Sequence, residues 1–348
     1  QMAKILGIRI QNYRVLKDVT LGKLWNTPQV KPLTPLTAVI GKNGVGKSSL
    51  FDAFGFLSDC LKYGVEEACD TPGRGGFDRI RSQGSKFPVE FQLYFQQENN
   101  FQPITYDIAF MKDKTGRPYV AWEVLRQRLK GQYSGSPSVW FNLLGGKGIV
   151  SKGEILRKQI DESISEYEFR KLLKLGTPFI EALPDIERID LEDKRKLGIA
   201  TLGALKQHPR ISAFREFMEG WYLSYFTPDA ARDLPQAGPQ KHLNRKGDNL
   251  GNVVQFMERD HPKRFKSILK RIAEKIPGID KIDTVVSEDG RLLLCFNDKG
   301  FTDPFYAQQM SDGTLKAFAY LLLLEDPTPP PLICIEEPEN CLYHKLLE

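Results

Sequence analysis

The chain has 348 residues, of which 41% are hydrophobic and 27% charged, with a formal net charge of +5. These proportions are typical of a globular protein, and no apolar run reaches the roughly 20 residues that a membrane-spanning helix needs. The five cysteines show no CxxC or Cys/His spacing, which excludes structural zinc and fits a reducing cytoplasm. The mild positive charge permits contact with nucleic acid without implying it.

The first third of the chain combines strand and helix patterns. Residues Lys4 to Ile10 alternate weakly and predict a strand, and a second strand is predicted from Leu36 to Ile40, after Pro32 and Pro35. Apolar residues then recur at helical spacing from Leu50 to Leu61, and Gly64 predicts the end of that helix. Three more alternating segments predict an antiparallel side sheet: Val89 to Phe95, Ile104 to Phe110 and Tyr119 to Val124, with a turn over residues 113–116.

The pattern changes from about Gly131. Glycine, serine and proline predict a loop there, and helical patterns follow over residues 155–175 and 210–226. We interpret this segment as a mainly helical insertion. The sequence therefore predicts three parts: an N-terminal lobe over residues 1–130, the insertion over 131–245 and a C-terminal lobe over 246–348.

The last third returns to alternating helices and strands. Residues 249–256 and 262–275 predict helices, and a hairpin is predicted about Asp289-Gly290. A helix starts near Ser311 and ends before Pro327. The short apolar run from Leu332 to Ile335 is typical of a buried parallel strand.

A phosphate-binding motif, GxxxxGK[ST], spans Gly41 to Ser48 between the predicted strand and helix. Glycines let the backbone point N–H groups at phosphate oxygens, and the helix that follows adds its positive end. Lys47 is expected at the β- and γ-phosphates and Ser48 at Mg²⁺. A glycine turn with a solvent-facing lysine is the alternative. The expected nucleotide contacts are Gly41, Asn43, Gly44, Val45, Gly46, Lys47, Ser48 and Ser49.

Two further groups of residues in the last third carry candidate chemistry. Glu336 and Glu337 follow an apolar strand, so the first is placed to hold Mg²⁺ and the second to orient or deprotonate a water molecule. The alternative is an ordinary solvated strand end. Ser311 and Gly313 open a helix, either as a simple N-cap or as a second anion site for a nucleotide on another subunit.

The order of these motifs resembles the ABC-type AAA ATPases related to the RecF, OLD and SMC-head families. The segments that carry the resemblance are Ile8 to Arg14, the phosphate loop, Tyr225 to Pro228, Lys246 to Leu250, Ser311 to Thr314 and Ile335 to Asn340. The resemblance implies an α/β fold: a P-loop NTPase with an ABC-type ATPase head, a mixed central sheet, an antiparallel side sheet and a helical insertion.

The same resemblance implies a function. Two subunits, or a higher oligomer, bind ATP and Mg²⁺ in a head-to-tail sandwich, with Lys47 and Glu337 catalytic. Ser48, Glu336 and Gln83 hold the metal, although a surface role for Gln83 is an equal alternative. Glu336 stands where an aspartate is usual, and Tyr343-His344 where His-Pro is common. The family's last strand, with its phosphate-sensing histidine, is expected beyond Glu348.

Three functions remain open at this stage. The first is an ATPase switch or motor in bacterial anti-phage defence that controls an effector protein. The second is a RecF-like repair ATPase that binds DNA, for which basic residues near Lys241 and along residues 263–271 are candidates, with a solvated helix face as the alternative. The third is the nucleotide-binding subunit of a transporter. Tyr13 is expected either to stack on adenine or to lie in the core.

Overall fold

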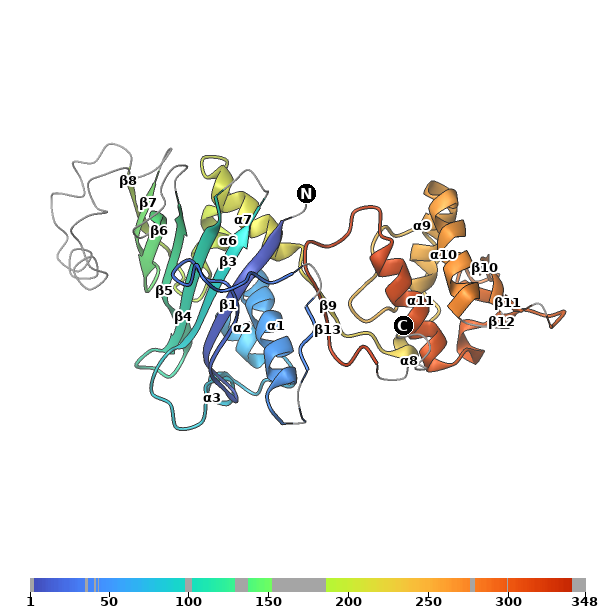
Figure 1. Ribbon diagram of the computed structural model, residues 1–348, viewed down its shortest axis with the longest axis horizontal. Helices are drawn as coiled ribbons and strands as arrows, with labels where there is room; N and C mark the ends of the chain where they lie inside the picture. Colours follow the sequence, from blue (N-terminus) through green and yellow to red (C-terminus); the bar gives the residue numbers. More distant parts are fainter. Residues whose placement is uncertain are drawn as a thin grey trace. The chain divides into compact units, whose positions relative to one another are not determined.

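A computed structural model describes most of the chain. The described residues are 3–34, 37–40, 42, 44–97, 102–128, 137–151, 186–275, 279–298 and 300–339. They form two compact units, Gln1–Trp221 and Tyr222–Glu348 (Figure 1). Both units combine helices with strands, so the protein is of the mixed α/β class. Within the described ranges no helix combines the length and the apolarity that crossing a bilayer requires.

An eight-stranded antiparallel sheet, ordered β2-β1-β3-β4-β5-β6-β7-β8, forms most of the first unit. Phe91, Leu93 and Phe95 alternate with polar residues and are buried, which explains why their segment forms a strand with one face toward the core. The predicted side sheet is confirmed. Its strands are β1 Lys4–Tyr13, β2 Leu16–Gly22, β3 Val89–Gln96, β4 Ile104–Lys112, β5 Pro118–Gln127, β6 Ser138–Leu144, β7 Lys147–Ser151 and β8 Ile186–Asp190.

Helices α1 (Lys47–Tyr63) and α7 (Pro209–Glu219) cover one face of this sheet (Figure 1). Phe56 of α1 packs against Phe91 and Phe110, and Phe214 of α7 against Phe95. As predicted, α1 ends at Gly64, whose φ of 96° is one that glycine adopts readily. Shorter helices complete the unit: α2 Val65–Asp70, α3 Phe77–Ile80 and α6 Gly198–Leu202.

The second unit packs helices on a small antiparallel sheet. Helix α9 (Leu250–Asp260) and helix α10 (Pro262–Lys275) contact strands β10 (Ile279–Val286) and β11 (Leu292–Asp298), which form the predicted hairpin. Helix α11 (Asp312–Leu324) adds Leu315, Phe318 and Leu322 to the same core. The smaller elements are α8 Pro228–Ala231, β12 Phe305–Tyr306 and the 3₁₀ turn Ala307–Gln309.

Strand β13 (Ile333–Ile335) pairs in parallel with β9 (Tyr222–Ser224). The prediction of a parallel strand just before the glutamate pair is therefore confirmed. Its residues are only partly buried, unlike those of β9, which are buried. The other strand pairs in the described part of the chain are antiparallel.

The apolar run before the phosphate loop is not a strand in its described part. Residues 37–40 are irregular, and Val39 and Ile40 are 46% and 93% exposed. An apolar pattern predicts an extended segment, but a strand also requires a neighbour that completes the hydrogen-bond ladder. Residues 37–40 pair with no described strand. The predicted strand is wrong for these residues, while Leu36 lies outside the described ones.

Strands occupy part of the segment that the sequence predicts to be mainly helical. β6, β7 and β8 extend the sheet from β5, and the predicted loop at Gly145-Gly146 is the turn between β6 and β7. The sequence predicts a loop from about Gly131 rather than strands, because glycine and serine obscure the alternation. Pairing with neighbouring strands, starting from β5, supplies the missing stabilisation. Of the predicted helices, 155–175 lies outside the described residues, and 210–226 corresponds to α7 followed by β9. The division into three parts stays a prediction.

Candidate functional site

Helix α1 starts at the residue that the phosphate-loop motif predicts. Its N-cap is Gly46, whose φ of 107° lies in the left-handed region, and Gly44 has a φ of 83°. Side chains other than hydrogen are disfavoured at such angles. The two glycines therefore let the chain turn directly into a helix that begins with Lys47.

The turn of the β1–β2 hairpin lies against this loop. A Cβ atom on Gly46 would be 2.8 Å from Cδ2 of Leu16 and 3.0 Å from Cγ2 of Val15. A side chain at position 46 would therefore push the hairpin away, in addition to straining the backbone. The hairpin shapes the second half of the loop, and the motif alone does not indicate this contact.

Several groups at the start of α1 suit a phosphate. Nζ of Lys47 lies over the loop and donates to the carbonyl oxygen of Lys42 at 3.0 Å. Ser48 is exposed, and no described side chain caps the start of the helix at Gly46. The first backbone N–H groups of a helix point out of its N-terminal end and carry partial positive charge. Gly41 and Asn43 lie outside the described residues.

Tyr13 belongs to the core, so the alternative in which it stacks on adenine is wrong. Its side chain is fully buried, with ring centroids 5.6 Å from Phe56 and 5.7 Å from Phe91. The hydroxyl donates to Oδ2 of Asp52 at 2.5 Å. Burial, and then the nearby Asp52 carboxylate, raise the pKa of Tyr13 well above its usual value, so the hydroxyl keeps its proton.

An ionic network surrounds Asp52, which lies on α1 shortly after the phosphate loop. Asp52 pairs with Arg14 and Arg74, each at 3.0 Å. Arg74 also pairs with Asp59 at 2.7 Å, and its side chain is only 3% exposed. Two carboxylates from α1 thus hold one buried guanidinium, which is how a buried charge is tolerated. The sequence analysis missed this network because its members are far apart along the chain.

The start of α11 is capped as predicted. Oγ of Ser311 accepts a hydrogen bond from the backbone N–H of Thr314 at 3.2 Å. Arg232 reinforces this end of the helix: it donates to the carbonyl of Met310 at 2.8 Å and pairs with Asp312. Ser311 is exposed and Gly313 partly exposed. Ser311 therefore caps α11 and keeps its hydroxyl at the surface, and its contact with a phosphate stays a prediction.

The two glutamates follow β13 at its carboxyl end. Glu336 is partly buried and Glu337 exposed. Glu337 has a φ of 46°, which is uncommon for a residue with a side chain. Lys316 of α11, itself 7% exposed, donates to the carbonyl oxygen of Glu337 at 3.0 Å. This buried lysine ties the glutamate turn to the helix that Ser311 caps, a contact that no sequence motif indicates.

The predicted site residues are divided between the two units. The phosphate loop and Gln83, which lies in an exposed turn between α3 and β3, belong to the first unit. Ser311, Gly313, Glu336 and Glu337 belong to the second. Within the second unit, Lys316 links α11 to the turn that carries the glutamate pair. Within the first unit, Gly46 of the phosphate loop lies against Val15 and Leu16 of the β1–β2 hairpin.

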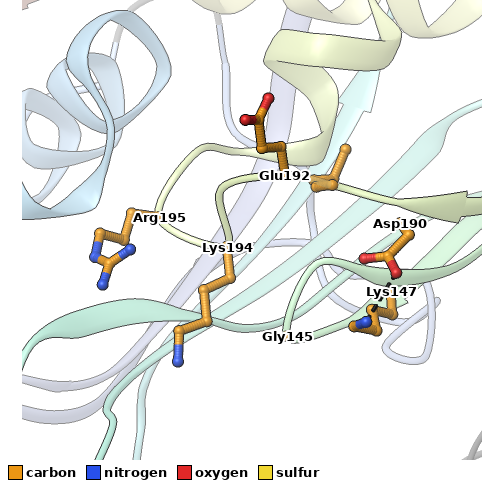
Figure 2. Close-up of a pocket in the computed structure, with 7 residues that line it drawn as sticks. Gly145, Lys147, Asp190, Glu192, Lys194 and Arg195 are labelled. Carbon is orange, nitrogen blue, oxygen red and sulfur yellow. Dashed lines mark hydrogen bonds and ion pairs between the residues drawn. The ribbon is translucent and has the colours of Figure 1, made fainter. Parts of the chain in front are cut away.

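An open pocket of about 470 Å³ lies beside β7 and the edge strand β8 of the eight-stranded sheet (Figure 2). It carries both signs of charge, because Lys147 pairs with Asp190 at 2.8 Å. Its lining is Gly145, Lys147, Asp190, Leu191, Glu192, Lys194 and Arg195.

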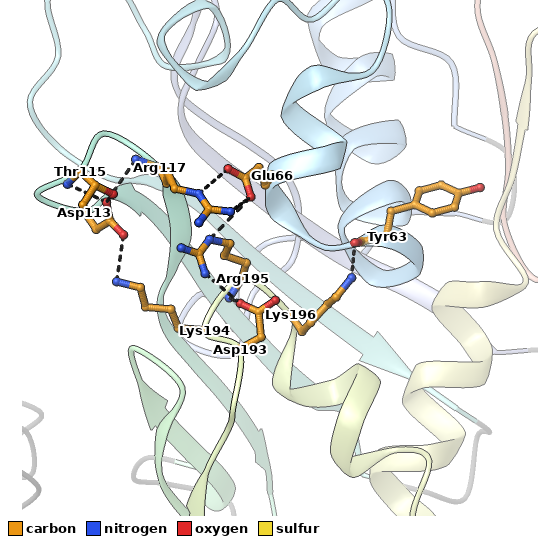
Figure 3. A network of polar contacts seen from close by, with 9 residues as sticks. All are labelled: Tyr63, Glu66, Asp113, Thr115, Arg117, Asp193, Lys194, Arg195 and Lys196. Carbon is orange, nitrogen blue, oxygen red and sulfur yellow. Dashed lines mark hydrogen bonds and ion pairs between the residues drawn. The ribbon is translucent and has the colours of Figure 1, made fainter.

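The other cations of this pocket are also paired, within the network of Figure 3. Lys194 pairs with Asp113 at 3.1 Å, and Arg195 with Asp193 at 3.2 Å. Hydrogen bonds from Thr115 and Lys194 lower the pKa of Asp113, so this carboxylate stays ionised. Because its cations are paired with carboxylates, this pocket suits a phosphate less well than the start of α1 does.

Comparison with known proteins places most of the chain in one family. The model described as "AAA domain, putative AbiEii toxin, Type IV TA system" matches residues 36–348, a range that includes the phosphate loop, Ser311 and both glutamates. A search of curated proteins finds no match to this chain.

Proposed function

We propose that this chain, which belongs to the AAA-domain family matched over residues 36–348, is an ABC-type ATPase that binds and hydrolyses ATP with Mg²⁺. The observation that carries the proposal is the start of α1. There, two glycines with positive φ lead into an uncapped helix, and the ammonium of Lys47 lies over the loop. Backbone amides, a helix dipole and a lysine together favour a polyphosphate.

In this proposal, nucleotide binding moves the ammonium of Lys47 from a backbone carbonyl to the phosphates. Its Nζ now donates to the Lys42 carbonyl, and a bound nucleotide offers phosphate oxygens that carry formal charge instead. A charge-assisted hydrogen bond is roughly twice as strong as a neutral one, so the exchange favours binding. The Tyr13–Asp52 hydrogen bond holds α1 against β1 while this side chain moves.

The residues present fit magnesium. Ser48 supplies an exposed hydroxyl, and Glu336 a carboxylate; both are the hard oxygen donors that Mg²⁺ prefers. Mg²⁺ usually keeps several water ligands and is bound through one or two carboxylates and substrate phosphates. When bound, the ion neutralises charge on the β- and γ-phosphates. Gln83 is the remaining proposed ligand.

Glu337 is the proposed catalytic carboxylate. Its left-handed backbone, fixed by Lys316, sets the direction of the side chain at the end of β13. An exposed carboxylate there can orient a water molecule and accept its proton. The backbone strain at such a site is consistent with a functional constraint.

We further propose that two copies of the chain form the complete site. Ser311 and Gly313 of one copy would meet the γ-phosphate bound by the other, using the exposed hydroxyl and the positive end of α11. ATP binding would close this dimer and hydrolysis would open it. The family description names a toxin–antitoxin system, so the partner is proposed to be an effector or antitoxin protein in phage defence.

The proposal is tested with three proteins: the wild type, Lys47→Ala and Glu337→Gln. We expect Lys47→Ala to lose binding of a fluorescent ATP analogue. Glu337→Gln should bind it normally, lose hydrolysis and accumulate as an ATP-dependent dimer in light scattering. Lys114→Ala, at an exposed turn, is the control and should match the wild type. Equal ATP affinity in the wild type and Lys47→Ala would refute the proposal.

A further inference from the structure

Helix α10 of the second unit separates apolar and basic residues sharply. Phe265, Ile268 and Ile272 are buried in the core of that unit. The opposite face is exposed and basic over the whole length of the helix, and Glu274 is its one acidic residue. The exposed basic residues are Lys263, Arg264, Lys266, Lys270, Arg271 and Lys275. We call them the α10 basic face.

The positive charge of this face is largely uncompensated. Arg271 pairs with Glu325 of α11, while the other five cations make no ion pair within the part of the chain that the structure describes. Acidic side chains of neighbouring elements are already engaged: Asp260 pairs with Arg259, and Asp283 with Lys281. The face therefore offers a concentrated positive field to a partner.

The composition of the face indicates the class of partner. Pro262 and Ala273 are the only exposed apolar residues of α10, so it lacks the large apolar anchors of a protein–protein interface. A membrane-surface helix inserts its apolar face into lipid, but here Phe265 and its neighbours are buried within the unit. A polar, strongly basic surface is what nucleic-acid phosphates bind.

We propose that the α10 basic face binds the phosphate backbone of duplex nucleic acid without reading its sequence. Fourteen residues of helix extend roughly 21 Å, which is the length of about six phosphates along one strand. Lys263, Lys266 and Lys270 recur at spacings of three and four, so they lie along one side of the helix. The surface lies entirely in the second unit and does not depend on the proposed ATPase activity.

The test measures binding of the full chain to a short labelled DNA duplex by fluorescence anisotropy, without nucleotide. The triple variant Lys263→Gln, Lys266→Gln, Lys270→Gln removes three exposed charges that make no described ion pair, so its folding is expected to be unchanged by circular dichroism. Its Kd should rise about tenfold or more at low salt. The slope of log K against log salt should become shallower by about 3, near one for each lost phosphate contact.

A matched control carries the same loss of charge elsewhere. Lys17→Gln, Lys86→Gln, Lys114→Gln changes three exposed lysines of the first unit and should alter Kd less than about twofold. Equal weakening in both variants would show a general charge effect and overturn the proposal, as would no duplex binding by the wild type. Poly-glutamate that binds while DNA does not would also overturn it. A parallel series with duplex RNA identifies which duplex is preferred.

Discussion

The hydroxyl of Tyr13 donates a 2.5 Å hydrogen bond to Oδ2 of Asp52, and this bond joins the end of β1 to the helix that begins with Lys47. The same carboxylate pairs with the buried guanidinium of Arg74 through its other oxygen. The N-terminal hairpin and the phosphate-loop helix are thus held by one polar network beneath the candidate site. The contribution of this network to the stability of the protein can be measured without nucleotide.

We expect Tyr13→Phe to lower the free energy of unfolding by about 2 kcal/mol, because a hydrogen bond to a charged group is lost while the ring remains packed. Urea unfolding of the two proteins measures this difference. Tyr63→Phe, at a residue that is 56% exposed, is the control and should change stability little. A loss in the control as large as that in Tyr13→Phe would contradict the role of the Asp52 contact.

Gly46→Ala should destabilise the protein more than Gly44→Ala. Both replacements place a side chain at a positive φ, which costs roughly 1–3 kcal/mol. Only the Cβ atom at position 46 meets Val15 and Leu16; that at position 44 meets no atom of the described residues within 4 Å. Thermal unfolding without nucleotide compares the two variants directly. Equal melting temperatures would show that the hairpin does not constrain the loop.

Glu123 of β5 gives stability a dependence on pH. Its side chain is 1% exposed and accepts hydrogen bonds from Gly198, Ile199 and Tyr106. Burial raises its pKa from 4.5 to about 7, more than these hydrogen bonds lower it.

The sign follows from this direction. The folded state keeps the proton to higher pH than the unfolded state, so the free energy of unfolding falls as pH rises from about 4.5 to about 7. Glu123→Gln should remove this contribution, which is on the order of 3 kcal/mol at 1.36 kcal/mol per pKa unit. Urea unfolding of both proteins across this range measures it. Stability profiles of the two proteins that stay parallel across this pH range would contradict the prediction. Buried His208, whose pKa burial lowers, affects both proteins in the opposite direction, so its effect cancels when one profile is subtracted from the other.

Replacements of Ser311 separate its capping role from its proposed contact with phosphate. Ser311→Ala should lose about 1 kcal/mol of stability with the cap. Ser311→Asp keeps an oxygen for the N–H of Thr314 and should keep the melting temperature, but its negative charge should repel a γ-phosphate and abolish ATP hydrolysis. Melting temperature and hydrolysis rate are measured together. An active Ser311→Asp variant would show that Ser311 only caps α11.

Local chemistry was enough to predict several elements. The start of α1 after Gly46 and its end at Gly64 follow from the conformations that glycine permits. Helix α10 was predictable because its apolar residues recur at helical spacing. Strand β3 was predictable because its apolar residues alternate with other residues. The candidate phosphate loop was found for the same reason, since its motif is a continuous run of residues.

Pairing across the chain was not predictable from such patterns. Residues 38–40 are apolar, yet an extended segment becomes a strand only beside a partner strand, and the sequence pattern does not identify that partner. The strands β6 to β8 were missed because pairing with neighbouring strands, in a series that starts from β5, stabilises them rather than their own propensity.

The sequence alone determined where the phosphate loop lies and which helix follows it, because backbone freedom and side-chain periodicity are properties of neighbouring residues. Only the tertiary structure decided that Asp52 meets Tyr13 and Arg74, that Lys316 holds the turn at Glu337, and that the α10 basic face is left uncovered. Those contacts join residues far apart in the chain. Their free energy depends on burial and distance, which exist only once the chain has folded.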